Sequence, residues 1–276
     1  MGTIVFGAVC PHGPIAVTET CTEDELQLAA VTREAFEDLG RRAAAARPDT
    51  IVVVTPHNVH VQGAMAVVIA GALEGAVAGT DGRTIGLEAA TDRELADFVL
   101  EALHDAGVPT VGVSYGGNRV DEAAMPMDWG TLIPLWHLGG RASPSPSVVV
   151  VSPARDLSPH AHVDAGRAIA AAVTRSDRSV VFVASADHGH CHDADGPYGY
   201  HPASAEYDGE VSTIVGENHL EELLALEPAF VEHAAADSWW QLLMLHGALG
   251  DGWQAELLSY EAPTYYGMLC AAFTPA

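Results

Sequence analysis

Short runs of β-branched residues alternate with long alanine-rich stretches along this chain. The short runs have the length and composition of buried strands, and the alanine-rich stretches have the apolar spacing of helices. Alternation of the two predicts an α/β fold. We expect one domain over residues 1–276, with a central, mostly parallel or mixed sheet that is flanked by helices and closed by a C-terminal β-hairpin.

The expected strands follow the β-branched runs, at residues 4–9, 51–55, 66–70, 109–114, 148–152 and 180–185, with a hairpin at 255–260 and 266–273. The expected helices lie at residues 22–46, 91–106, 159–175, 203–217, 228–235 and 237–249. Thr91 stands three positions before Glu94, which predicts a hydroxyl cap at the second helix. Residues 187–208 show no period and are rich in His, Asp, Gly and Pro, as long functional loops are.

The charge balance excludes several classes of function. Acidic residues number 37 against 12 basic ones, and all of the basic residues are Arg. Without lysine the chain has no ε-amine for a Schiff base or a Walker-type phosphate site. A formal charge of −25 disfavours contact with phosphate backbones, so we expect no nucleic-acid partner. The apolar runs are too short for a membrane span, so we expect no membrane partner either.

The cysteines and the N-terminus indicate the compartment. Four cysteines in a chain of this length, with no CxxC pair, are typical of reduced thiols. The first residues match a strand and lack the features of an export signal. We therefore expect a cytoplasmic protein.

Three histidines directly follow expected buried strands. His12, His57 and His190 come after the strands at 4–9, 51–55 and 180–185, and a proline precedes each of the first two. Open α/β sheets place their ligand sites at such carboxyl ends. Two imidazoles and one carboxylate form the facial triad that non-haem Fe(II) enzymes use, so a carboxylate from elsewhere in the chain is expected to join two of them.

Several motifs occur in a characteristic order: Pro-His-Gly at 11–13, Thr-Pro-His at 55–57 and Ser-x-Asp-x-x-His at 185–190. Segments 127–135, 199–208, 259–261 and 265–267 add further matches. Together they resemble the class III extradiol dioxygenases, the superfamily of the catalytic subunit of protocatechuate 4,5-dioxygenase, which also includes the Memo proteins. The resemblance covers nearly the whole chain.

The resemblance implies that His12 and His57 bind the metal and that His190 is the catalytic acid and base. The third ligand of the family precedes a late helix, which here points to Asp237. The dioxygenases usually have Glu there and Memo has Cys, so Glu232 and Glu261 remain alternatives. Asp237 also has the residue type of a helix cap.

Two further choices stay open at the residue level, because His60 is an alternative to His57 and His188 is an alternative to His190. All four histidines lie beyond the ends of the expected strands. The alternation of side chains between the two faces of a strand therefore cannot decide between the members of either pair. Asp187 is expected to have a catalytic role by orienting the imidazole of whichever of His188 and His190 acts.

The residue types also suggest a substrate-binding wall, formed by Trp129, Tyr198, Tyr200, His201 and Tyr265. These aromatic side chains are also ordinary core residues.

The expected function is that of an Fe(II)-dependent extradiol dioxygenase of aromatic compound catabolism. It would cleave the ring of a small aromatic diol or aminophenol with O2. A homodimer or a small accessory subunit is the expected assembly. The alternatives are a Memo-like metal-binding protein without ring cleavage and a zinc hydrolase, which the same kind of ligand set would serve.

Overall fold

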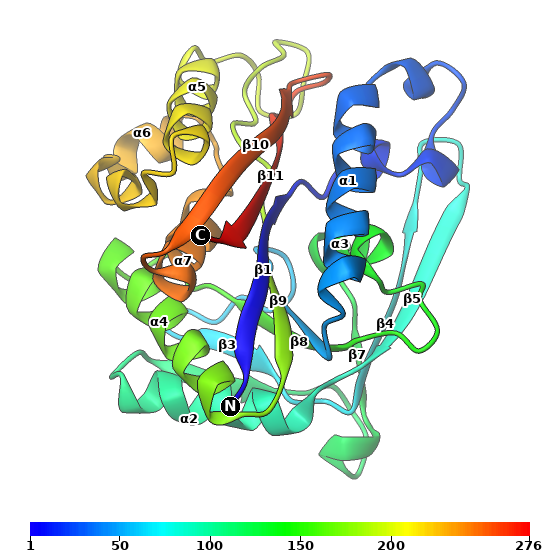
Figure 1. Cartoon of the computed structure of the whole chain (residues 1–276). Helices are drawn as coiled ribbons and strands as arrows, with labels where there is room; N and C mark the ends of the chain where they lie inside the picture. Colours follow the sequence, from blue (N-terminus) through cyan, green and yellow to red (C-terminus); the bar gives the residue numbers. More distant parts are fainter.

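Eight strands form the central sheet of this protein, in the order β10-β11-β1-β9-β2-β8-β3-β6 (Figure 1). The structure is a computed structural model that describes residues 1–276. The strands are β1 Thr3–Cys10, β2 Thr50–Val54, β3 Met65–Val68, β6 Thr110–Val113, β8 Ser147–Ser152, β9 Ser179–Ser185, β10 Trp253–Glu261 and β11 Met268–Pro275.

The middle of this sheet is parallel and its edges are mixed. Strands β1, β9, β2 and β8 run parallel to one another, whereas β3 is antiparallel to β8. The C-terminal hairpin of β10 and β11 adds to β1 in antiparallel fashion. The expectation of a mixed sheet with a closing hairpin in a single α/β domain is confirmed.

Seven α-helices accompany the sheet (Figure 1). They are α1 Ala30–Ala46, α2 Arg93–Asp105, α3 Trp129–Leu138, α4 Pro159–Arg175, α5 Ala203–Gly216, α6 Pro228–His233 and α7 Trp239–Leu249. Short 3-10 helices lie at Pro14–Ala16, Thr18–Thr20, Glu25–Gln27, Val120–Glu122 and Leu220–Ala225.

Strand β2 shows how the sheet divides the core in two. Its five residues are all buried, because helices cover both faces of the parallel sheet. Successive side chains of a strand point to opposite faces, so Val52 and Val54 join one apolar cluster while Ile51 and Val53 join the other. The first cluster includes residues of α2, α4 and α7, and the second includes residues of α1 and α3.

A smaller sheet was not expected from the sequence. It contains three strands in the order β5-β4-β7, with β4 at Ala72–Ala78, β5 at Thr84–Ala90 and β7 at Ala124–Pro126. Helix α3 was not expected either. The β4 and β5 segments are rich in Ala and Gly and carry few β-branched residues, and α3 contains Pro134, so the usual signals are weak in both places.

Two expectations about helix starts are wrong. Helix α1 begins at Ala30 and not at residue 22, because the preceding segment forms turns and the 3-10 helix Glu25–Gln27. Asp92, and not Thr91, caps α2, since its carboxylate accepts the backbone N–H of Leu95 at 3.1 Å. Asp92 is fixed in that place by Thr50 and Arg178, which both donate to its Oδ2.

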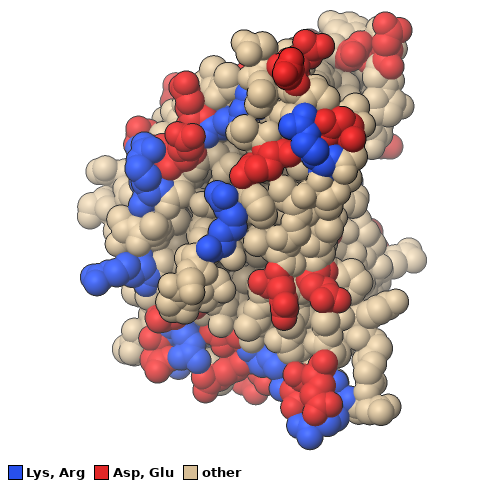
Figure 2. All heavy atoms as spheres, turned by 90° about the vertical axis from the view of Figure 1, so that its right-hand side faces the viewer, with Lys and Arg blue, Asp and Glu red and all other residues tan.

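The surface reflects the excess of acidic residues. Figure 2 shows one face on which acidic side chains gather in several patches, with arginine side chains interspersed among them. Among the helices, none combines the length and the apolar character needed to cross a membrane.

Candidate metal centre

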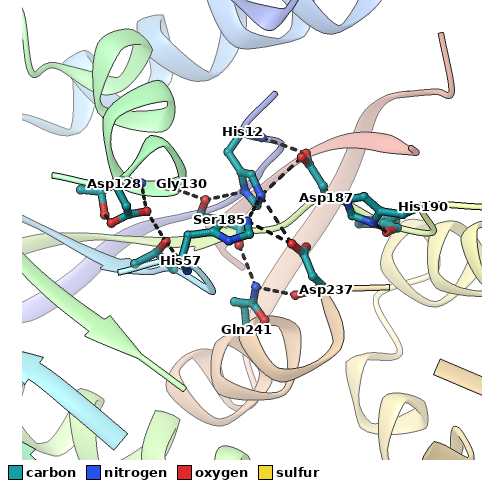
Figure 3. Close-up of polar contacts among 12 residues, drawn as sticks. His12, His57, Asp128, Gly130, Ser185, Asp187, His190, Asp237 and Gln241 are labelled. Atoms are coloured by element: carbon teal, nitrogen blue, oxygen red, sulfur yellow. Dashed lines mark hydrogen bonds and ion pairs between the residues drawn. The ribbon is translucent and has the colours of Figure 1, made fainter. Parts of the chain in front are cut away.

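The site lies where the carboxyl ends of three neighbouring parallel strands meet. Strand β9 lies between β1 and β2, so the residues that follow these strands come together at one edge of the sheet. His12 stands two residues after β1, and His57 stands three residues after β2. Asp237, two residues before α7, approaches from the helix side (Figure 3).

His12, His57 and Asp237 each offer one ligand atom, and these atoms lie within 4.8 Å of one another. The Nε2 atoms of the two imidazoles are 3.0 Å apart. Oδ2 of Asp237 lies 3.2 Å from Nε2 of His57 and 3.6 Å from Nε2 of His12. Of the sequence alternatives, neither Glu232 nor His60 belongs to this group.

The arrangement fits a divalent metal ion. Metal–ligand bonds of about 2.0–2.2 Å place neighbouring ligand atoms roughly 3 Å apart around the ion, as these three are. The second carboxylate oxygen of Asp237, Oδ1, is buried without a hydrogen-bond partner. Two imidazoles and one carboxylate are also the donor set of facial-triad iron sites and of catalytic zinc sites.

Ser185 fixes the tautomer of His12. Its hydroxyl donates a hydrogen bond to the carbonyl of Gly130 at 2.5 Å. The oxygen of the hydroxyl therefore accepts a hydrogen bond from Nδ1–H of His12, 2.9 Å away. With the proton on Nδ1, the lone pair of Nε2 faces His57 and Asp237. This is the orientation a metal ligand needs.

The two buried charges of the site shift each other's pKa. Burial alone would lower the pKa of His12, but the carboxylates of Asp187 and Asp237 outweigh it and raise the pKa to about 9. Burial alone would raise the pKa of Asp237, and its contacts with His12 and His57 hold it well below its ordinary value instead. Without a metal, the pair is therefore stabilised as an imidazolium and a carboxylate.

The start of α3 holds the His57 loop. Asp128 caps this helix by accepting the backbone N–H of Thr131 at 3.0 Å. The same carboxylate accepts the hydroxyl of Thr55 at 2.7 Å and the amide of Asn58 at 3.0 Å, on either side of His57. The ring of Trp129 stacks on that of His57 with centroids 4.3 Å apart.

A cavity of about 750 Å³ opens beside the three residues. It is lined by both metal-site and aromatic side chains, among them His57, Asp237, His190, Tyr198, Trp239 and Trp240. His12 is buried behind this wall, with 1% of its surface exposed. The cavity therefore gives a small molecule access to His57, Asp237 and His190 together.

His190 and His188 occupy different environments. Nδ1 of His190 lies 2.8 Å from the backbone carbonyl of His188, which places a proton on Nδ1 and leaves Nε2 free. His188 is fully buried, does not line the cavity, and has no hydrogen-bond partner at either ring nitrogen. Burial lowers the pKa of His188. The geometry therefore favours His190 for proton transfer.

Asp187 contacts His12 and forms no hydrogen bond with the imidazole of His188 or His190, which the sequence had suggested. Its Oδ1 accepts the backbone N–H of His12 at 2.9 Å, and its Oδ2 lies 3.3 Å from Nε2 of His12 (Figure 3). The carboxylate thus steadies His12, whereas Nδ1 of His190 is held by the carbonyl of His188. Glu261, the other alternative to Asp237 as third ligand, lies apart from the centre and accepts hydrogen bonds from Thr32.

The expected aromatic wall divides into two groups. Trp129 stacks on His57, and the ring of Tyr265 lies 6.0 Å from that of His190. Tyr200 is 63% exposed and His201 stacks on His233, and neither lines the cavity. In the same loop, His192 and Tyr200 form an antiparallel bridge.

Three supporting residues were missed at the level of sequence: Ser185, Asp128 and Gln241. Gln241 of α7 donates to the carbonyls of Ser185 at 3.1 Å and of Asp237 at 2.6 Å, which fastens the helix to the end of β9. Asp128 and Ser185 lie in segments that the sequence analysis matched, and the position of Asp128 three residues before Thr131 is that of a helix cap. Nothing local assigns a hydrogen-bond partner to Ser185 or Gln241, because their partners lie on distant segments.

Comparison with known proteins agrees with this geometry. Residues 7–272 match the family model of the catalytic LigB subunit of aromatic ring-opening dioxygenase. The chain is 26% identical over 252 residues to Protein CA_C1420 of Clostridium acetobutylicum, a match that covers 91% of this chain and 53% of that protein. The chain thus spans about half the length of this relative.

A solved structure has the same fold. The crystal structure of the uncharacterized protein JW3007 from Escherichia coli K12 superimposes with a TM-score of 0.61, covering 97% of this chain and 99% of that one. At 18% identity this likeness concerns the fold. The match of the family model over nearly the whole length shows that the chain belongs to the family of the catalytic LigB subunit of aromatic ring-opening dioxygenases.

Proposed function

We propose that this protein is an Fe(II)-dependent extradiol dioxygenase that opens the ring of a catecholic or aminophenolic substrate with O2. One observation carries the proposal: His12, His57 and Asp237 converge on one point beside a cavity that His190 also lines. Membership of the LigB family supports an aromatic substrate.

Three protein ligands on one side leave coordination positions open for small molecules. An Fe(II) ion held by His12, His57 and Asp237 would supply a chelation point for the two adjacent heteroatoms of the substrate and would bring O2 next to the ring. The role of the chain is then to hold the substrate, to exclude water and to move protons.

His190 is placed for the proton transfers. Its Nδ1 proton is engaged by the carbonyl of His188, so Nε2 can take a phenolic proton as the substrate binds. The same nitrogen can return the proton to an oxygen atom later in the reaction. An imidazole suits both directions because the same ring nitrogen can accept a proton and later return it.

The cavity wall suits a flat aromatic guest. Tyr198, Trp239 and Trp240 line the cavity together with Asp237 and provide aromatic surface. Aromatic side chains stack on aromatic ligands and bury them with little loss of their own conformational freedom. We propose that this wall, with Trp129 and Tyr265 at its margin, holds the ring of the substrate.

The test is anaerobic loading with Fe(II), followed by oxygen-uptake and absorbance measurements with a panel of catechols and aminophenols. The proposal requires uptake of one O2 per substrate and the yellow colour of a semialdehyde product. Protein loaded with Zn(II) is the matched control, and it should take up no oxygen.

Two variants locate the activity. His57→Ala should lose both iron and oxygen uptake, whereas His190→Phe should keep the iron and lose turnover. Hydrolysis of ester or amide substrates by the Zn(II) form, with no oxygen uptake by the Fe(II) form on any catechol, would contradict the proposal and indicate a zinc hydrolase. Tight metal binding without either reaction would indicate a metal-binding protein.

A further inference from the structure

A buried carboxylate on α5 contacts the backbone next to His190. Asp208 has 0% of its surface exposed, and its Oδ1 accepts the backbone N–H of Gly189 at 2.7 Å. That N–H belongs to the same peptide group as the carbonyl of His188, which accepts the proton on Nδ1 of His190. We infer that Asp208 positions His190 through this one peptide group, an inference that rests on the proposed function.

The geometry of a peptide makes the connection direct. The bond between His188 and Gly189 is trans, because the only cis bond of the chain joins Ser143 and Pro144. In a trans peptide the N–H and the C=O point in opposite directions. Asp208 therefore holds one end of the group while the imidazole of His190 is bound at the other end.

The carboxylate does more than fix the peptide plane. A hydrogen bond from an N–H to a charged acceptor is shorter and stronger than one to a neutral acceptor. It also polarises the peptide, so that the carbonyl at the other end becomes a better acceptor. The carbonyl of His188 thereby holds the proton of His190 on Nδ1 and keeps Nε2 available to the cavity.

Asp208 is itself held in one orientation by two further donors. Its Oδ2 accepts Nε2 of His192 at 2.8 Å and the hydroxyl of Tyr260 at 2.6 Å. A buried carboxylate is costly unless it is hydrogen-bonded in this way. Both donors come from segments other than α5, namely the loop after β9 and strand β10, so the orientation of Asp208 depends on the assembled fold.

The surrounding backbone leaves the N–H of Gly189 to Asp208 alone. Gly267 pairs with the same segment, since its carbonyl accepts the N–H of His188 at 2.8 Å and its N–H donates to the carbonyl of Gly189 at 2.9 Å. A β-carbon on Gly267 would lie 1.9 Å from Oδ2 of Asp208. The close approach of the carboxylate to this segment therefore requires glycine at position 267.

The test follows the proton on His190 rather than turnover alone. Nitrogen-15 spectra of the Zn(II)-loaded protein, with histidine labelled, report which ring nitrogen carries the proton. The wild type should show His190 as the Nδ1–H form. Asp208→Asn, which keeps an acceptor for Gly189 and removes the charge, should show a mixture of both forms, and Asp208→Ala should show a larger loss of the Nδ1–H form.

Ser204→Ala is the matched control. The hydroxyl of Ser204 holds the same loop one step further on, accepting the N–H of Cys191 at 2.8 Å and donating to the carbonyl of Ala234 at 2.9 Å. Its removal should lower the free energy of unfolding and leave the nitrogen-15 signals of His190 unchanged. If Asp208→Ala does not fold, Asp208→Asn and this control still decide the question.

Activity of the Fe(II) form supplies the second readout. Asp208→Asn should lower kcat by about tenfold, the size of effect seen when an outer partner of a functional imidazole is lost, with KM changed little. Unchanged His190 signals in Asp208→Asn, together with lower stability, would overturn the inference and leave Asp208 a purely structural residue. Absence of turnover in the wild type would contradict the proposed function, whereas the nitrogen-15 comparison would still decide the role of Asp208.

Discussion

Nδ1 of His12 lies 2.9 Å from the hydroxyl of Ser185, which is occupied as a donor by the carbonyl of Gly130. The hydroxyl therefore acts as an acceptor toward His12 and sets the nitrogen that faces the metal centre. Ser185→Ala should reduce the affinity for Zn(II) or Fe(II) by about tenfold, because the imidazole loses the partner that orients it. A competition titration against a chelating dye measures the change.

Ser152 provides the control for that substitution. It also ends a parallel strand, β8, and is buried, but its hydroxyl accepts the backbone N–H of Val59 and contacts no metal-site residue. Ser152→Ala should leave metal affinity as in the wild type. Equal losses in both variants would show that the effect comes from the strand ends in general and not from His12.

Removal of the charge on Asp237 should affect metal binding more strongly. Asp237→Asn keeps the shape of the side chain and removes the anionic oxygen that lies near both imidazoles. We expect metal affinity to fall by more than about a hundredfold, beyond the effect of losing an outer partner. Asp187→Asn, which changes the neighbouring carboxylate instead, should retain measurable binding in the same titration.

Metal affinity should depend on pH through His12. Because its pKa is raised to about 9, the metal-free protein carries a proton on His12 at neutral pH, and binding must displace it. The affinity should therefore rise by about tenfold for each pH unit between 7 and 9 and level off above. Calorimetry in buffers of different ionisation enthalpy would count the released proton, and a flat affinity over this range would contradict the assignment.

Acid should destabilise the fold through His137 on α3. Burial, and then the charge of Arg141, lower its pKa from 6.5 to about 4. Between these values the unfolded chain takes up a proton that the folded protein does not, so the free energy of unfolding falls as pH falls. The group's share of that loss is about 3 kcal/mol and is complete near pH 4.

Urea unfolding at several pH values between 4 and 7 tests this expectation. His137→Gln should flatten the acid limb of the stability curve, even if the loss of its stacking on Phe36, 4.2 Å away, lowers stability at every pH. His104→Gln, which changes an exposed histidine of α2, should keep the slope of the wild type. The same slope in all three proteins would show that His137 does not contribute.

The sequence predicted the parts of the site that depend on single strands. His12 and His57 follow strands that each contain five consecutive buried residues, and such apolar runs are readily identified. Position after a strand then determines the edge of the sheet on which a side chain lies. Asp237 came only from the family resemblance, because nothing local distinguishes it from a helix cap.

The parts that the sequence did not predict depend on contacts between distant segments. Gln241 and His246 are the polar residues of a mostly apolar helix, and the role of Gln241 is visible only when the carbonyl of Ser185 lies against it. The contact of Asp187 with the backbone N–H of His12 was not predicted for the same reason, since the two residues are 175 positions apart. Strands β4 and β5 were not predicted because half-exposed, glycine-containing segments carry little β-sheet signal.

The centre draws its residues from widely separated segments, with His12 just after β1 and Asp237 just before α7. A growing polypeptide on the ribosome thus exposes two of the three side chains long before the third is made. The complete set requires α7 to be docked against β9, where Gln241 binds the carbonyl of Ser185. A product truncated before residue 237 would consequently keep both histidines but lack the carboxylate that helps to retain an ion bound by all three groups.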